Sequence, residues 1–509
     1  MILMDILLLL MVAALIRITP TLMVKHGAGV DQWFWKAYID KLRTQKVFPP
    51  SLPQFLLDKE QWYPPLFPLL IAKLPAIVFE RYSMQLSIII DLLRMVLLMV
   101  AVWWLSHSEL ALLIAGSVYC LTPLLISYNM QLNPRGLGAL FLDAMWLSVL
   151  GVWLGELSQW YALLSLIFAG LVLITHKMTT QVFWFTALFA AIFLQDIRIA
   201  ALIPCSMLMA LLLSAGFYRR VFRAHVDIIS FWYKNWHWSG SNPILESPIY
   251  GEPNFESPSK YYRKGIASWI RRLQFVIGFN PWMPAVLLIV ILAVLGGHNY
   301  SQAEIFILLW MTLSFAFALS TTVIPQLRCF GNGYLYGYNG VFPAALALGI
   351  TAPALIKSWY WLPIFVLTIL ACLAALFAFF KALKSSRTMK VESDLHDAIA
   401  YLKQLPQGVV MCLPQHWHDV VAYQTGKTVA FGGHGFGFNL LQPIFPRLMM
   451  PISEWIGLYN IRYLLTMPSY LNDKFVNDLP AAQIKKFGDY QLYCFDDSTN
   501  ANTGQKHEQ

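Results

Sequence analysis

The residues with the clearest chemical potential are a carboxylate and several cations at the margins of apolar segments. Asp31 follows the first apolar segment, within the run His26-Gly27-Ala28-Gly29-Val30-Asp31-Gln32. Arg135, His176-Lys177 and Arg328 stand at the margins of later apolar segments. Charges this close to hydrocarbon are costly and usually carry function. A carboxylate can act as a general base, and arginine holds a phosphate through paired hydrogen bonds.

Each of these residues also has a structural interpretation, which the residue types alone leave open. Asp31 can cap an interfacial helix that contains Trp33-Phe34-Trp35, because a carboxylate accepts hydrogen bonds from free helix N–H groups. Arg328 can be a snorkelling anchor, and Arg135 can contact lipid headgroups. His176-Lys177 can be an ordinary interfacial pair.

Composition places the chain in a membrane. Of its 509 residues 58% are hydrophobic and only 12% charged, and the mean hydropathy is +0.56. Soluble domains carry about 25% charged residues, so we expect an integral membrane protein. The net charge of +9 favours anionic partners such as headgroups or a phosphorylated lipid. Nucleic acid is not expected as a partner, because no compact basic domain with groove-reading elements is evident.

Apolar segments of bilayer length predict a polytopic α-helical membrane protein with about 11 transmembrane helices. The first segment has no basic region before it and is long enough to remain as a span, so no cleavable signal is expected. The expected spans are 2–23, 85–106, 109–128, 137–155, 159–176, 180–195, 198–216, 281–297, 303–324, 341–357 and 359–381.

The loops between these segments place the non-membrane mass on one face. We expect a transmembrane domain over 1–384, with an interfacial loop at 24–84 and a long aromatic and basic loop at 217–280. Prolines and charges interrupt the apolar run in the first of these loops, which suits interfacial helices better than a span. A protein built in this way is expected to work on its loop-rich face.

The composition changes after Lys381 and predicts a small C-terminal soluble α/β domain over 385–497, followed by a disordered tail at 498–509. The helix is expected at Asp394–Leu405, and the strands at Val409–Leu413, Thr428–Phe431, Ile461–Leu465 and Tyr490–Phe495. A disulfide between Cys412 and Cys494 is possible on sequence grounds. A set of possible zinc ligands also occurs in this domain, but a cluster without fixed spacing more often marks turns and surface histidines. The possible ligands are His416, His418, Asp419 and His434.

Charged residues inside the apolar segments are expected to be structural. Asp91 and Arg94 stand one helical turn apart, which predicts an ion pair within the second segment. Asp5 and Arg17, in the first segment, are assigned no catalytic role.

The chain resembles the GT-C superfamily of glycosyltransferases, which use polyprenyl-phosphate-linked sugars. Protein mannosyltransferases, the aminoarabinose transferases of lipid A and oligosaccharyltransferases belong to this group. The resemblance rests on Asp31 after the first segment and on the loop ending Tyr63-Pro64-Pro65-Leu66-Phe67-Pro68. The loop Asn129–Gly136, Thr175-His176-Lys177 and Arg328 before a late segment contribute to it, as does the C-terminal domain.

This resemblance implies an inverting membrane glycosyltransferase whose acceptor is a glycan, a lipid or a protein. Asp31 would be the catalytic carboxylate and Arg328 would hold the phosphate of the donor. His176, Lys177, Arg135 and Tyr63 would also bind substrate. The implied location is a bacterial inner membrane, with the active face periplasmic.

The chain has fewer acidic residues than the family pattern at two places, beside Asp31 and in the loop before Arg135. Gln32 follows Asp31 where mannosyltransferases and aminoarabinose transferases usually carry a second acid. The stretch Met130–Arg135 has no acid, and Asp143 lies two helical turns further on. Because a hard cation needs several oxygen ligands, dependence on Mg²⁺ or Mn²⁺ is doubtful, and no cofactor is expected with certainty.

Two other classes of function compete with the enzyme. A lipid or polysaccharide transporter usually shows repeated halves and broken helices, and no repeat is evident here. A non-catalytic envelope-assembly protein would use Asp31 only as a helix cap. The orientation is also contested, because the basic residues gather on the loop-rich side and the positive-inside rule would place that side in the cytoplasm.

Overall fold

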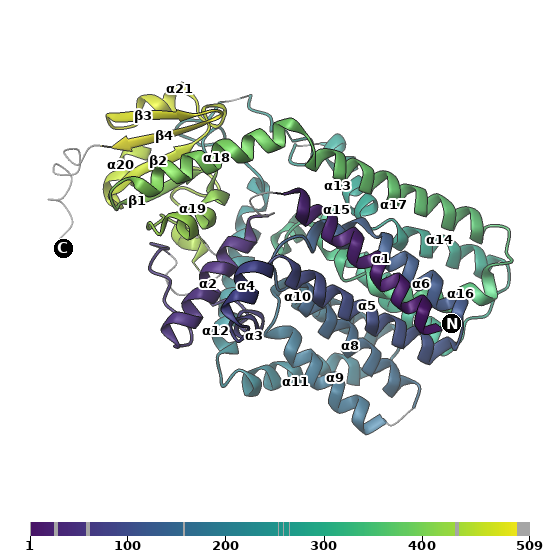
Figure 1. The fold of residues 1–509 in the computed structure, drawn as a ribbon. Coiled ribbons are helices and arrows are strands. Elements are labelled where there is room, and N and C mark those ends of the chain that lie inside the picture. The colour runs from purple at the N-terminus through teal and green to yellow at the C-terminus, as the bar shows by residue number, and fades with distance from the viewer. Residues whose placement is uncertain are drawn as a thin grey trace.

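The computed structural model describes residues 2–24, 29–57, 62–155, 158–252, 254–257, 259–263, 265–432 and 437–495. Its larger part is a bundle of apolar helices that lie side by side, with the N-terminus at the end far from the C-terminal domain (Figure 1). The bundle helices are α1 (Ile2–Met23), α5 (Gln85–Ser106), α6 (Glu109–Leu121), α7 (Pro123–Tyr128), α8 (Arg135–Trp153), α9 (Ser158–Leu173), α10 (Lys177–Phe193), α11 (Ile197–Leu213), α14 (Trp282–Leu295), α15 (Gln302–Val323), α16 (Val341–Leu355) and α17 (Trp361–Leu383).

Each of the eleven apolar segments corresponds to a helix, with α6 and α7 sharing one segment. By length and composition alone, 5 of the described helices can cross a membrane, namely α1, α5, α8, α15 and α17. The pair α13 (Ile266–Phe279) and α14, bent by 83°, is a possible sixth crossing. The architecture is therefore that of a helical membrane protein, and the count of eleven crossings stays a prediction.

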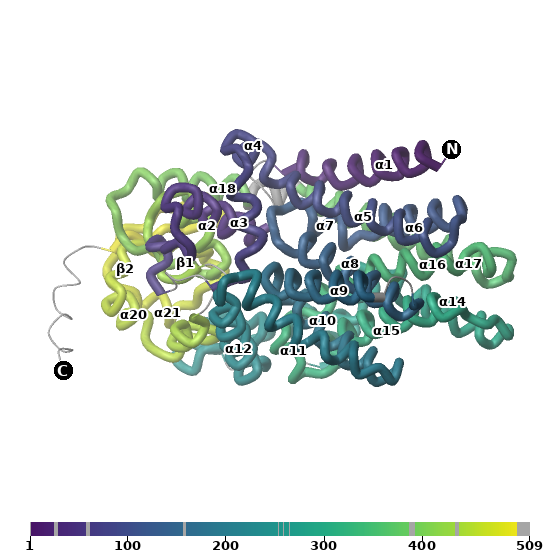
Figure 2. The backbone as a smooth tube through the Cα atoms, turned by 90° about the horizontal axis from the view of Figure 1, so that it is seen from below, coloured from purple at the N-terminus to yellow at the C-terminus, as the bar shows by residue number. Residues whose placement is uncertain are grey.

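Short helices from the two long loops gather at one end of the bundle, between it and the C-terminal domain (Figure 2). Those of the first loop are α2 (Asp31–Gln45), α3 (Leu66–Ala72) and α4 (Ala76–Tyr82). Prolines at 65 and 75 precede α3 and α4, each of seven residues, in the loop expected to form interfacial helices. Later segments add α12 (Tyr218–Asn235), η1 (Trp236–Trp238), η2 (Pro325–Phe330) and η3 (Gly333–Tyr338).

The C-terminal domain is a four-stranded sheet with helices. The strand order is β1-β2-β4-β3, with β1 parallel to β2 and the other pairs antiparallel. The strands are β1 (Val409–Leu413), β2 (Ile461–Thr466), β3 (Ala482–Phe487) and β4 (Tyr490–Phe495). The helices are α18 (Ser386–Gln404), η4 (Gln415–Trp417), α19 (His418–Thr425), η5 (Phe438–Leu441), α20 (Ile452–Leu458), η6 (Pro468–Tyr470) and α21 (Asp473–Asn477).

Two expectations for this domain are wrong. Thr428–Phe431 is not a strand, because only Val429 makes isolated bridges, to Phe55 and Val410. All six cysteines are free, and β2 separates the strands that carry Cys412 and Cys494. The strand β3 escapes sequence prediction because most of its side chains are exposed, so it lacks an apolar face.

His418 serves the structure of the C-terminal domain. His418 is buried, its Nε2 accepts a hydrogen bond from the Cys412 N–H at 2.9 Å, and its Nδ1 lies 2.8 Å from the Gln415 carbonyl oxygen. Within the described part of the chain, no three metal-binding side chains come together. His434, the fourth candidate ligand, and the tail 498–509 lie outside the described residues.

Two buried ion pairs join the first helices of the bundle. Arg17 of α1 pairs with Asp91 of α5, and Arg94 of α5 pairs with Asp143 of α8. The expected pair between Asp91 and Arg94 is therefore wrong, because each side chain reaches a different neighbouring helix. Tyr119 of α6 donates a hydrogen bond to Asp91 at 2.8 Å. The four charges compensate one another, as burial in a membrane domain requires.

Small residues allow α6 and α16 to pack closely. A Cβ added at Gly349 would lie 2.8 Å from both the Ala111 carbonyl oxygen and the Ala115 Cβ. Membrane helices gain much of their association energy from such close packing of small residues.

We therefore expect Gly349→Ala to destabilise the protein by about 1–3 kcal/mol, because the added methyl meets backbone rather than a movable side chain. The matched control is Gly278→Ala in α13, where an added Cβ meets nothing within 4 Å. The control should be neutral or stabilising, since alanine favours a helix by about 1 kcal/mol over glycine. Thermal unfolding in detergent measures both, and equal effects would contradict the close contact.

Candidate active site and the adjoining cavity

Asp31 begins α2 at the end of the bundle, where it is half-buried. Gly29, with a φ of +78°, packs so tightly on Gln131 that an added Cβ would lie 1.6 Å from its Oε1. Only glycine suits this position, and the contact holds the start of α2 against the loop before α8. The residue before the helix, Val30, makes no side-chain cap. Asp31 stands in the first turn, where the helix dipole favours a negative charge.

Tyr63 reaches the same place from the end of the first loop. The Leu66 N–H donates a hydrogen bond to the Ile174 carbonyl at 2.9 Å, which ties this loop to the turn between α9 and α10. Tyr63 is buried, its ring lies 4.7 Å from that of Trp35, and its hydroxyl is hydrogen-bonded to the Lys177 backbone. Burial, with the Asp31 carboxylate nearby, raises the pKa of Tyr63, so it remains a neutral phenol.

His176 caps the first turn of α10. Its Nδ1 accepts a hydrogen bond from the Thr179 N–H at 3.3 Å, so the proton of the neutral ring sits on Nε2. A Cβ at Gly138 would lie 2.8 Å from the Cβ of His176, which shows how closely α8 covers it. Burial, and then the charges of Arg135 and Lys177, hold the pKa of His176 well below its usual value. The ring is therefore a neutral donor rather than a cation.

Arg135 and Lys177 each occupy the first position of a bundle helix, α8 and α10. The positive end of a helix dipole disfavours a cation there. The Arg135 guanidinium lies 4.5 Å from the Tyr128 ring centroid and donates to the Leu335 carbonyl at 3.3 Å. Lys177 feels the attraction of Asp31 and the repulsion of Arg135. The cluster thus carries more positive than negative charge.

Five of the six predicted site residues therefore come together, from segments far apart in the sequence. Asp31, Tyr63, Arg135, His176 and Lys177 act on one another electrostatically. We refer to these five residues as the Asp31 cluster. The sixth, Arg328, has no hydrogen bond or ion pair to this cluster among the described residues.

A buried polar chain that sequence analysis missed connects the cluster to the segment carrying Arg328. His225 of α12 lies beside Lys177 and Tyr63 on the wall of a small cavity, and its Nε2 is 2.9 Å from Gln181 Nε2. Gln181 contacts the Tyr336 hydroxyl, which also donates to the Phe330 carbonyl, two residues after Arg328. The local sequence does not mark these residues, and only their meeting in space reveals them.

The acid stability of the protein should report on His225. Burial, together with the charge of Lys177, lowers its pKa to about 4. Between pH 6.5 and about 4 the unfolded chain binds a proton that the folded chain does not, so stability falls as the pH falls through this window. His225→Gln should flatten the decline of the unfolding temperature over that window relative to wild type. An unchanged slope would contradict a neutral, buried His225.

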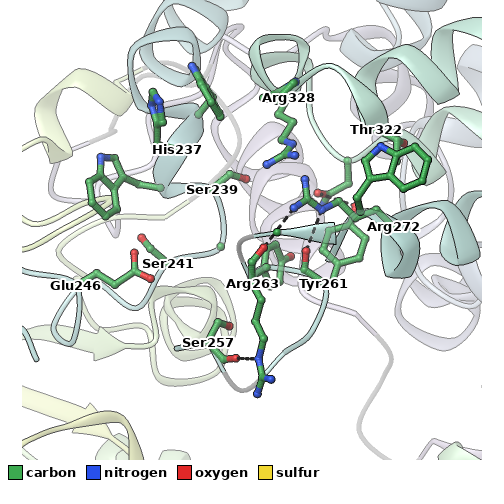
Figure 3. Close-up of a pocket in the computed structure, with 18 of the residues that line it drawn as sticks. His237, Ser239, Ser241, Glu246, Ser257, Tyr261, Arg263, Arg272, Thr322 and Arg328 are labelled. Atoms are coloured by element: carbon green, nitrogen blue, oxygen red, sulfur yellow. Dashed lines mark hydrogen bonds between the residues drawn. The ribbon is translucent and has the colours of Figure 1, made fainter. Parts of the chain in front are cut away.

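Arg328 lines a separate cavity of about 980 Å³ between the bundle and the segment 236–272 (Figure 3). The Nε of Arg328 is buried without a hydrogen-bond partner. Arg272 of α13, which sequence analysis missed, points into the same space. The cavity lies close to the segment that carries Lys177. A Cβ added at Gly331, which lines the cavity, would lie 3.6 Å from the Cε of Met178, the residue after Lys177.

The likenesses to known proteins are structural. No protein-family model matches the chain, and a search of curated proteins finds no match. ArnT from Cupriavidus metallidurans bound to undecaprenyl phosphate is similar with a TM-score of 0.59 at 10% identity, over 97% of this chain and 98% of that one. The archaeal oligosaccharyltransferase AglB from Archaeoglobus fulgidus, with an inhibitory peptide and a dolichol-phosphate, is similar with a TM-score of 0.57 at 12% identity, over 92% of this chain and 69% of that one.

Proposed function

From its GT-C-like fold, we propose that this membrane protein is a glycosyltransferase that takes a sugar from a polyprenyl-phosphate-linked donor. The observation that carries the proposal is the Asp31 cluster, in which one carboxylate faces two cations at helix N-termini. The ArnT structure holds undecaprenyl phosphate and the AglB structure a dolichol-phosphate, which supports a lipid phosphate as part of the donor.

Arg135 and Lys177 offer the positive charge that the phosphate of the donor requires. Each cation is opposed by the dipole of its own helix, so an anion between them would relieve two unfavourable interactions. The backbone N–H groups at the same helix ends provide further donors. Arg328 was predicted at this phosphate, but its side chain lines the large cavity instead. We therefore assign the phosphate to Arg135 and Lys177.

The charges that develop during the transfer reaction assign a role to each residue of the cluster. An acceptor hydroxyl or amide attacks the anomeric carbon as the bond from that carbon to the phosphate oxygen breaks, which inverts the configuration. Asp31 orients the acceptor and takes its proton. The departing phosphate gains charge, which Arg135, Lys177 and the Nε2–H of His176 stabilise. Tyr63 closes the site against Trp35.

The residues of this cluster do not fit a divalent metal. Asp31 is its single carboxylate, Gln32 follows it, and Lys177 and Arg135 would repel a cation. A hard cation requires several oxygen ligands. We derive no step of the reaction through a metal.

The transporter alternative is not favoured. The proposed transferase reaction is tested by following its lipid product. Reconstituted protein is mixed with a bacterial membrane extract that supplies lipid-linked sugars and acceptors, and lipids are followed by mass spectrometry. The sugar-bearing polyprenyl phosphate should decline while free polyprenyl phosphate accumulates. Passage of intact lipid-linked sugar across the bilayer, without release of the lipid phosphate, would instead identify a transporter.

Removing one phosphate-binding cation should weaken the donor site. Lys177→Gln loses a charge-assisted hydrogen bond, and we expect the KM for the donor to rise about tenfold or more. The matched control is Lys73→Gln, an exposed lysine of the same interfacial region. A fall in rate at saturating donor with an unchanged KM would place the phosphate elsewhere.

We also propose that the loop-rich face is extracytoplasmic, in a bacterial inner membrane. Support comes from α2, which begins with Asp31, and the C-terminal domain, because both lie at the same end of the bundle. The cations on this face then serve substrate binding and escape the positive-inside rule. A reporter that is active only outside the cytoplasm, fused after residue 509, should be active.

A further inference from the structure

One face of α12 is exposed, positively charged and unused by the proposed active site. The first two turns of the helix expose Arg219, Arg220 and Arg223. In the part of the chain that the structure describes, none of these three arginines forms an ion pair. The single acid of the helix, Asp227, instead accepts a hydrogen bond from Asn439 of the C-terminal domain. The face therefore has a positive charge that the helix itself does not compensate.

Two apolar side chains are exposed beside the arginines. Phe222 is 39% exposed and Val226 is 48% exposed. The ring of Phe222 lies 6.4 Å from that of Trp184 in α10, and Leu188, one turn further along α10, is also exposed. Residues four apart share one face of a helix, so Phe222 adjoins a face of α10 that exposes apolar atoms. We refer to the following residues together as the α12 face: Arg219, Arg220, Phe222, Arg223 and Val226.

The chain places the α12 face directly after an apolar helix of the bundle. The last two turns of α11 expose Leu208 and Leu212, as a helix that faces lipid does. Positive φ angles at Ala215 and Gly216 then turn the chain, and α12 begins at Tyr218. Figures 1 and 2 show α12 beside α11, at the end of the bundle nearer the C-terminal domain. The arginines therefore lie where the apolar surface of the bundle ends, which is the level of the lipid headgroups.

The other sides of α12 are held by contacts within the protein. His225 stacks on Trp184, with 5.6 Å between the ring centroids. Towards the C-terminal domain, the ring of Phe231 lies 5.4 Å from that of Phe438 and 6.1 Å from that of Phe445. These contacts on two sides prevent α12 from rotating its arginines inwards. The α12 face therefore stays turned outwards, and a partner for it comes from outside the described chain.

We propose that the α12 face binds the bilayer surface and selects anionic phospholipids. Guanidinium groups bind phosphate through paired hydrogen bonds, and each cation near an anionic surface adds to the attraction. Phe222 and Val226 enter the acyl boundary, as the apolar side chains of interfacial helices do. A lipid accounts for both kinds of side chain, whereas a soluble anion would leave the apolar ones in water. The proposal does not depend on the transferase function, because it involves neither Asp31 nor a donor.

A competing explanation is that the arginines only set the orientation of the protein. Arginines next to a membrane helix influence orientation during insertion. Arginines with that role alone would need no anionic lipid once the protein is in place. The lipid preference of the folded protein therefore separates the two explanations.

Lipid binding to the purified, delipidated full-length protein tests the proposal without turnover. Phosphatidylglycerol and phosphatidylcholine with identical acyl chains are titrated in detergent, and native mass spectrometry gives the affinity for each lipid. One arginine near an anionic surface strengthens binding about fivefold, so we expect phosphatidylglycerol to bind about fivefold or more tightly. The preference should shrink at high salt, because ions screen exposed charges. Equal affinities for the two lipids would overturn the proposal.

A triple variant locates the binding on α12. Combining Arg219→Gln, Arg220→Gln and Arg223→Gln should reduce the preference for phosphatidylglycerol to less than about twofold. Each single variant should lose part of the preference, which tests the face even if the triple variant is unstable. Lysine at the same three positions keeps the charge and should retain most of the preference.

The matched control removes three exposed cations from the C-terminal domain, combining Lys403→Gln, Lys474→Gln and Lys486→Gln. This control should bind both lipids as wild type does. A preference that persists in the glutamine variant of α12, or that the control loses equally, would contradict the α12 face.

The outcomes also separate this proposal from the transferase function. If wild type releases polyprenyl phosphate but shows no preference for phosphatidylglycerol, the proposal for α12 alone is wrong. If the preference is present but no lipid phosphate is released, the transferase function alone is wrong.

Discussion

Asp31→Asn should lower the rate of polyprenyl phosphate release about 10²- to 10⁴-fold, the range that a positioned general base contributes. The amide keeps the size and the hydrogen-bonding oxygen of the carboxylate, but it cannot take the proton of the acceptor. Because Lys177 and Arg135 remain in place, the KM for the donor should change little or fall, since the carboxylate no longer repels the phosphate. Steady-state release of lipid phosphate at varied donor concentration measures both quantities.

The control for this variant is Asp40→Asn on the same helix. Asp40 is half-buried and hydrogen-bonds Tyr423 of the C-terminal domain, so its loss tests for a general disturbance of α2. It should leave the rate within a few-fold of wild type. Equal losses in the two variants would make Asp31 a structural residue and favour the helix-capping interpretation.

The second large effect concerns the buried ion pairs. Arg94→Met leaves Asp143 fully buried without its cation, and removal of one partner of such a pair costs about 3–5 kcal/mol. We expect a large fall in the unfolding temperature in detergent and poor accumulation in membranes. The double variant Arg94→Met with Asp143→Leu should recover much of the loss, because no unpaired charge then remains.

The exposed pair of Arg198 with Asp196 provides the control, since it has the same residue types at the bundle surface. Arg198→Gln should produce no measurable shift in the unfolding temperature, as expected for solvent-screened ion pairs. If the double variant is no more stable than the single one, the arginine contributes through its hydrogen bond to the Tyr338 carbonyl rather than through charge compensation.

Local patterns in the sequence were sufficient to predict the helices of the bundle and to select the five residues of the Asp31 cluster. Apolar runs mark α1 and α5 because a lipid-facing helix must be apolar over bilayer length. Asp31 and Lys177 stand out because charges are rare at the edges of such runs. The fold class follows from these features, and the structural likeness to ArnT and AglB supports that fold.

These local patterns could not predict the contacts between distant segments. Asp91 and Arg94 share a helix, and nothing in their spacing shows that each pairs with another helix. Arg272 lies in an amphipathic stretch in which one arginine faces solvent and the next faces a cavity. Strand β3 is selected by its pairing with β4 rather than by its own exposed side chains. The burial of Asp91, Arg94 and Arg272 and the pairing of β3 all depend on tertiary packing.

The most direct test of the account is an experimental structure of the protein with farnesyl phosphate or a longer polyprenyl phosphate. We expect the phosphate to lie within hydrogen-bonding distance of Lys177 and Arg135, with a free oxygen, the position that carries the sugar in the donor, toward Asp31. A phosphate bound at Arg272 and Arg328, with the Asp31 cluster closed and unchanged, would contradict the assignment of the donor and with it the proposed active site.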